Sequence, residues 1–322
     1  MSFSHSWRRP PFADNGRPAM GKNIRQHRVI VFLCACLSLV VGACGGSDQG
    51  ALSGKDPQEI IQLASTGISQ NTARFTIDGQ YNVDTGGVHG VTPDDLKRLA
   101  GPLASSVTFK VQGEQESPQR VAGVFTVESG TPQVVHVVMY EGTTYASLDG
   151  TRYRQTDSIS GLTGPLGASP DGVNAYLGAP TSLEDRGSEQ KDGVTVEHLH
   201  GTLDDTSLDK IASRDQLLQL LKQFAHVTGG GLDVYSRQSD GKLDRATLDA
   251  KLDVNLDSVL GALGGVSSSA PGSTASKPGG TARLALHLDV HYFDYGAAIR
   301  VTRPMPDPTA PTLAPVGGLF SS

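Results

Sequence analysis

Residues 247–257 read Thr-Leu-Asp-Ala-Lys-Leu-Asp-Val-Asn-Leu-Asp, and every second residue in this stretch is apolar. Side chains of a β-strand point alternately to opposite faces, so this pattern predicts a strand with one buried and one wet face. Residues 284–292, Leu-Ala-Leu-His-Leu-Asp-Val-His-Tyr, alternate in the same way. One-sided strands of this kind are typical of antiparallel sheets.

The same alternation occurs earlier, in residues 75–83 and 107–112, and short turn signals separate the strand-like runs. A Gly that follows an acidic or small polar residue favours a tight hairpin turn, so we expect about ten strands in a meander. The turn signals are Glu128-Ser129-Gly130, Glu141-Gly142, Asp149-Gly150, Asp192-Gly193 and Asp240-Gly241.

Three segments have helical spacing of apolar residues. They are Pro57–Ile68 behind an Asp56 N-cap, Pro93–Leu103 starting at Thr92, and Arg214–Ala225, where Ser213 and Gln216 form a capping box. Gly229–Gly231 then reads as the stop of the third helix rather than as a phosphate cradle. The sequence therefore predicts an α+β fold in which helices cover the apolar face of a sheet.

The first 43 residues resemble a secretion signal. Arg25, His27 and Arg28 precede the apolar run Val29–Val41, which is too short to span a membrane. Met20 is an alternative start that would give a leader of ordinary length. The leader also carries most of the basic excess, so the exported part of this chain of net charge −6 is more acidic still. An acidic chain whose single Trp lies in the leader is not expected to bind nucleic acid.

Val41-Gly42-Ala43-Cys44 resembles the bacterial lipobox, in which the cysteine receives a diacylglyceryl thioether and acyl groups such as palmitate. We therefore expect a lipid anchor on Cys44 and a location on the outer face of the cell membrane. An unmodified Cys44 thiol is the alternative. Cys34 and Cys36 leave with the leader, so the exported chain has no internal disulfide.

Composition divides the exported chain into a flexible tether, one domain and a tail. We expect the tether at 44–56, the domain at 57–303 with a disordered Gly- and Ser-rich loop at 264–280, and a disordered Pro-rich tail at 304–322. The Gly-rich segment Ser158–Pro170 either gates a cavity or is a simple loop.

The sequence offers no constellation of catalytic or metal-binding residues. His198 and His200, and likewise His287 and His291, are spaced to share one strand face, but no third ligand has a recognisable spacing to either pair. We interpret them as exposed histidines on polar strand faces. Without a nucleophile elbow or a zinc-protease motif, we expect neither an enzyme nor a metal site or cofactor.

The order of leader, lipobox, helix and long antiparallel meander resembles the actinobacterial LppX/LprG lipoprotein family, whose fold is similar to the LolA lipoprotein carrier. The segments that carry the resemblance are Tyr140–Tyr145, Asp149–Arg154, Asp192–Asp204, Leu232–Tyr235, Asp240–Leu243 and Leu288–Pro304. The resemblance implies a curved, half-open antiparallel sheet, an unclosed barrel, with helices on its concave face. It also implies an apolar cavity that takes acyl chains of membrane lipids or lipoglycans, and no catalytic residue.

We expect helix and strand residues to meet around this cavity. The predicted lining residues are Leu217, Leu220, Leu221, Phe224, Leu252, Val254, Leu286 and Leu288. The alternative is that these residues close a dry, solid core. The resulting hypothesis is a monomeric, non-catalytic carrier or presenter of lipid, and an envelope transporter is an open candidate for its partner. A sensor or scaffold lipoprotein with the same fold and no lipid cargo is the alternative function.

Overall fold

A computed structural model describes residues 50–89, 106–128, 132–156, 170–212, 219, 222–258 and 279–312. All of them belong to one unit, Asp48–Ser322. Several predicted features lie outside the described residues: the leader, Cys44, the helix at 93–103, and all but the last two residues of the 264–280 loop.

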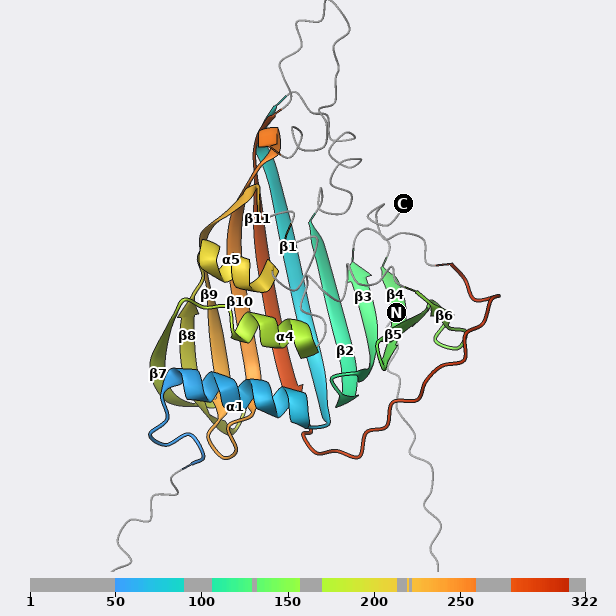
Figure 1. Ribbon diagram of the computed structural model, residues 1–322, viewed down its shortest axis with the longest axis horizontal. Helices are drawn as coiled ribbons and strands as arrows, with labels where there is room; N and C mark the ends of the chain where they lie inside the picture. The colour runs from blue at the N-terminus through green and yellow to red at the C-terminus, as the bar shows by residue number, and fades with distance from the viewer. Residues whose placement is uncertain are drawn as a thin grey trace, which may run out of the picture. The chain divides into compact units, whose positions relative to one another are not determined.

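The described strands form one antiparallel sheet of 11 strands (Figure 1). They are β1 Ala73–His89, β2 Val107–Ser117, β3 Arg120–Glu128, β4 Gln133–Tyr140, β5 Thr143–Ser147, β6 Arg154–Gln155, β7 Ser182–Lys191, β8 Val194–Thr202, β9 Ala225–Arg237, β10 Leu243–Asn255 and β11 Gly279–Phe293. Their order is β6-β5-β4-β3-β2-β1-β11-β10-β9-β8-β7, so the sheet is not closed and β6 and β7 are its edges. The predicted open antiparallel sheet is confirmed, but it consists of two meanders, β1 to β6 and β7 to β11, which are joined by the pairing of β1 with β11.

The register shows why alternation decides this fold. Leu248 of β10 lies opposite Leu288 of β11, and Ala246 lies opposite Val290, so the apolar residues of neighbouring strands share one face. We call this the helix face and the opposite side the polar face. Two tight turns also follow the prediction: φ is positive at Glu141 and Gly142 and at Asp192 and Gly193, as two-residue hairpin turns of type I′ require.

The three described helices lie on the helix face of the sheet, over the strands from β1 and β11 to β7 (Figure 1). They are α1 Pro57–Gln70, α4 Pro170–Leu177 and α5 Asp205–Ala212. The predicted start of α1 is confirmed, because Asp56 Oδ1 accepts from the Glu59 N–H at 2.8 Å and Glu59 Oε2 accepts from the Asp56 N–H at 3.2 Å. This capping box satisfies backbone donors that the first turn leaves unpaired.

A buried side chain of β2 holds the other end of α1. Gln115 is fully buried, and its Nε2 donates to the carbonyl oxygens of Ile68 and Asn71, the latter at 3.1 Å. The last carbonyls of a helix lack partners within the helix, so this amide satisfies acceptors that burial would otherwise leave unpaired. The contact fixes α1 on the sheet.

Two local expectations were wrong, and two helices were missed. The helices α4 and α5 were not predicted, because each is only 8 residues long and gives little periodic signal. The third predicted helix does not reach Ala225: residues 222–224 form a turn and Ala225 begins β9. Gly229–Gly231 lie inside β9 rather than at a helix end, and a Cβ on Gly230 would lie 2.3 Å from the Asp249 carbonyl oxygen of the neighbouring strand.

The expected tail does not begin at Pro304. Residues 294–312, which we call the C-terminal strap, run from the end of β11 to β6 at the far edge (Figure 1). Arg154 donates to the carbonyl oxygens of Pro308 and Ala310 at 2.8 and 3.1 Å, and the Asp307 N–H donates to the Tyr153 carbonyl at 2.7 Å. The Pro-rich composition indicated disorder, but Pro leaves carbonyl oxygens free to accept bonds from the sheet.

Two glycines make room for aromatic rings between β1 and β2. Gly79 lies opposite Phe109, and Gly113 lies opposite Phe75. Each ring packs directly against the Cα of the opposite glycine. A Cβ on Gly79 would lie 2.0 Å from the Phe109 ring, and a Cβ on Gly113 would lie 2.4 Å from the Phe75 ring. Each aromatic side chain therefore covers a glycine of the neighbouring strand, which is a cross-strand pairing that stabilises sheets.

Replacing Gly79 with Ala should lower the free energy of unfolding by about 1–3 kcal/mol, because the Phe109 ring must move away from a well-packed position. The matched control is Gly229→Ala, also within a strand, where a Cβ would meet no atom within 4 Å. Urea titration followed by circular dichroism measures both. Equal effects of the two substitutions would contradict the proposed ring-on-glycine packing.

Candidate functional site

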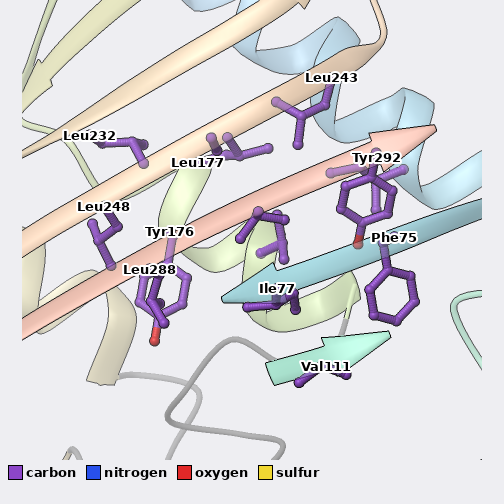
Figure 2. Packing of buried hydrophobic residues seen from close by; sticks show 14 of the residues in the cluster. Phe75, Ile77, Val111, Tyr176, Leu177, Leu232, Leu243, Leu248, Leu288 and Tyr292 are labelled. Atoms are coloured by element: carbon purple, nitrogen blue, oxygen red, sulfur yellow. The ribbon is translucent and has the colours of Figure 1, made fainter. Parts of the chain in front are cut away.

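The half of the helix face nearest α1 is a tightly packed core. The rows of side chains that cross the sheet there are almost fully buried, with exposed fractions of 0 to 5%; they are Ile77, Val290, Ala246, Val234 and Leu199 in one row, and Leu288, Leu248 and Leu232 in the next. We call these two rows the lower rows. Tyr176 and Leu177 of α4 point toward the lower rows and cover them (Figure 2).

Toward the other end of the same strands, most apolar side chains are only partly buried, although Ala225 and Ala282, which lie opposite Val254, are buried. We call this region the upper apolar surface; it comprises Val83, Val227, Ala250, Leu252, Val254, Leu284 and Leu286. These residues are direct neighbours across strands, since Leu284 lies opposite both Val83 and Leu252, and Leu252 also lies opposite Val227. The same face of the same paired strands is therefore solid core near α1 and a partly open apolar surface toward the other end.

The predicted lining residues divide between these two regions. Leu252, Val254 and Leu286 lie in the upper apolar surface, and Phe224 adjoins it because its carbonyl accepts from the Asn255 N–H at 2.8 Å. Leu288 lies instead in the lower rows, with 1% of its surface exposed. Leu217, Leu220 and Leu221 lie outside the described residues.

The sequence reasoning did not single out Val83, Val227, Ala250 and Leu284 as candidate lining residues. Leu284 and Ala250 belong to the same alternating runs as the predicted residues, so periodicity alone could have included them. Val83 and Val227 required the strand register, which places them opposite Leu284 and Leu252.

Two tyrosines of the helix face lie in a dry environment. Burial raises the pKa of Tyr81, at the border of the upper apolar surface, to about 12. Burial also raises the pKa of Tyr292, which lies opposite Phe75 in the packed core at the other end of the strands and whose hydroxyl makes no hydrogen bond. Both phenols therefore stay neutral at physiological pH, and neither provides a charged group for catalysis.

The histidine pairs lie on the polar face, as the alternation predicts. His198 Nε2 and His200 Nδ1 each lie 2.9 Å from Asp233 Oδ1 on the neighbouring strand, and the His198 ring stacks on Tyr235. The other two histidines do not converge, since His287 contacts Asp249 and His291 lies against Phe293. Within the described ranges, no group of three or more His, Cys, Asp or Glu side chains has an arrangement that could hold a metal ion.

Comparison with solved structures finds chains of similar fold, whereas the sequence comparisons find none. No protein-family model and no curated protein sequence matches the chain. The chain is similar in fold to LprF and LppX. The structure of LprF from Mycobacterium bovis is 14% identical, with a TM-score of 0.39 over 77% of this chain and 96% of that one.

The structure of the lipoprotein LppX from Mycobacterium tuberculosis is 15% identical, with a TM-score of 0.36 over 77% of this chain and all of that one. The likeness expected from the sequence is thus confirmed as a likeness of fold alone. Over the described ranges, no helix combines the length and the apolar character that crossing a bilayer requires.

The contrast between the two regions predicts different costs for similar truncations. Leu288→Ala should lower the free energy of unfolding by about 2–5 kcal/mol, because it leaves a cavity in the packed lower rows. Leu286→Ala, one row higher, should cost no more than about half as much, because its side chain is already partly exposed. Urea unfolding of both variants is the measurement, and equal costs would show that the upper apolar surface is solid core.

The polar face predicts a dependence of stability on acid. Burial raises the pKa of Asp233, but hydrogen bonds from His198 and His200 outweigh burial, and the net pKa is lowered. A lowered folded-state pKa gives stability that is complete above the unfolded value near 3.9 and is lost as pH falls through the folded value.

Wild type should therefore lose more stability than Asp233→Asn between pH 5 and pH 3. Urea midpoints across this range measure the difference, with Asp249→Asn as a control on the same face. Parallel pH curves for wild type and Asp233→Asn would show that Asp233 makes no net contribution through ionisation.

Proposed function

We propose that the protein is a membrane-anchored lipoprotein that binds acyl chains of a lipid or lipoglycan against the upper apolar surface and carries or presents them in the cell envelope. The observation that carries this proposal is the passage from fully buried lower rows to seven partly buried aliphatic side chains on the same strands. Contiguous apolar surface that a fold leaves partly open is typical of a binding site.

Transfer energetics explain why such a surface is useful. A lipid with two chains of about sixteen carbons loses roughly 25 kcal/mol of hydrophobic stabilisation when it enters water, at about 0.8 kcal/mol per methylene. Free diffusion between membranes is therefore negligible. A partly buried aliphatic surface replaces much of the lost stabilisation without binding so tightly that release becomes slow.

The chemistry of the surface favours a broad cargo. The upper apolar surface consists of Val, Leu and Ala, which offer no hydrogen bonds and no aromatic platform. Aliphatic side chains bind acyl chains through contact area rather than through directed interactions. We infer that the protein distinguishes acyl chains from polar solutes more strongly than one acyl chain from another.

The sequence at Cys44 supports the anchored part of the proposal. A diacylglyceryl group on this cysteine would hold the protein at the outer face of the membrane, next to its lipid supply. In this proposal the exported chain acts as a monomer without cofactor and without catalysis, and its paired histidines His198 and His200 serve the sheet through their contacts with Asp233.

Leu286→Trp should reduce the lipid that co-purifies with the protein, because a larger ring occupies the upper apolar surface. The measurement is mass spectrometry of organic extracts from protein purified without its anchor, expressed per mole of protein. The matched control is Ala285→Trp, which places the same side chain one residue earlier on the polar face of the same strand.

Wild type and Ala285→Trp should carry equal amounts of lipid, and Leu286→Trp distinctly less, with circular dichroism confirming that all three are folded. Extracts of folded wild-type protein that contain no lipid would refute the carrier and favour a scaffold with the same fold.

A further inference from the structure

The N-terminal part of the domain contacts one end of the sheet from Gly50 onward, although its composition predicts a flexible tether up to residue 56. Leu52 is buried and lies against Gly241 in the turn between β9 and β10. Gly50 is in direct backbone contact with Gln238 of the same turn, since a Cβ on Gly50 would lie 2.5 Å from the Gln238 carbonyl oxygen. The expected tether of residues 44–56 is therefore wrong for residues 50–56, which belong to the domain.

This early fixation leaves a short link to the proposed anchor. Six residues of chain lead from Cys44 to Gly50. A fully extended chain covers at most about 3.6 Å per residue, so the link reaches at most about 22 Å. The turn between β9 and β10 therefore stays within about 22 Å of the lipidated cysteine in every conformation of the link.

The upper apolar surface lies toward the opposite end of the same strands. β10 begins at Leu243 beside this turn and ends at Asn255, twelve residues further on. At about 3.3 Å per residue the two ends are about 40 Å apart. We call the end of the sheet at the β9–β10 turn the near end and the opposite end the far end. Leu252 and Val254 lie toward the far end of β10. Figure 1 shows α1 at the near end and the tips of β1 and β11 at the far end.

These lengths decide which lipid surface the far end can meet. With the strands perpendicular to the anchoring bilayer and the far end against it, the turn between β9 and β10 would stand about 40 Å above that bilayer. That height is roughly twice the reach of the link. The far end meets its own bilayer only when the strands are inclined by less than about 35° to the plane of that bilayer.

We propose that the far end exchanges acyl chains with a second lipid bilayer rather than with the bilayer that holds Cys44. This inference rests on the proposed function, because it assigns the direction from which the same surface is loaded. The short link acts as a spacer: it keeps the near end at the anchoring membrane and presents the upper apolar surface outward.

The test uses the complete exported chain attached to phosphatidylcholine vesicles through Cys44 and a maleimide lipid, since no other cysteine remains after the leader. A self-quenched fluorescent phospholipid is placed either in the same vesicles as the protein or in separate vesicles, and its dequenching reports uptake. Leu286→Trp defines the background of each arm. A second protein carries about 20 inserted Gly and Ser residues between Ser47 and Asp48, a flexible segment whose r.m.s. end-to-end distance is roughly 25 Å and whose full extension is about 70 Å.

With the native link, uptake from separate vesicles should exceed uptake from the anchoring vesicles several-fold, and the lengthened link should bring the two rates close together by raising only the second. Equal rates with the native link, or a ratio that the insertion does not change, would overturn the inference while leaving lipid binding intact. Uptake at the Leu286→Trp background in both arms would overturn the proposed function itself and the inference with it.

Discussion

A wide antiparallel sheet with one apolar face must shield that face from water. The rest of the structure depends on which part of the face the helices cover. The cover is tight over the lower rows, where α1 is held at its start by a capping box and at its end by the Gln115 amide. Because both ends of α1 are fixed by polar contacts, its apolar side chains add burial without further loss of backbone freedom. Stability is therefore concentrated at one end of the strands.

The uneven cover separates folding from binding. A face that was packed along its whole length would have no room for a ligand, and a face that was open along its whole length would not fold alone. The sheet avoids both outcomes because the same alternating strands run through both regions, so Leu288 belongs to the core while Leu286, two residues away, remains partly open. Under the proposed function, loss of lipid from the upper apolar surface would leave the lower rows unchanged.

The sequence predicted those features that depend on short-range patterns. Alternation placed β10 and β11 and their faces correctly, and Asp56 with Pro57 predicted the start of α1. It did not predict α4 and α5, since helices of two turns contain too few apolar repeats to stand out. It also misplaced the glycines of β9, because three consecutive glycines favour a helix stop unless a neighbouring backbone requires a small residue, as the Asp249 carbonyl does at Gly230.

The remaining errors have one cause, and it bears on function. Both chain ends of the domain looked flexible from their composition, yet Gly50 and Leu52 contact the β9–β10 turn and the C-terminal strap is bound by Arg154 at the edge strand. Composition measures what a segment would do alone, whereas these segments are ordered by long-range contacts that no local pattern contains. The consequence concerns reach: contacts at Gly50 leave only six residues of chain from Cys44 to the domain, and an anchor proposed on Cys44 would therefore hold the near end of the sheet close to its membrane.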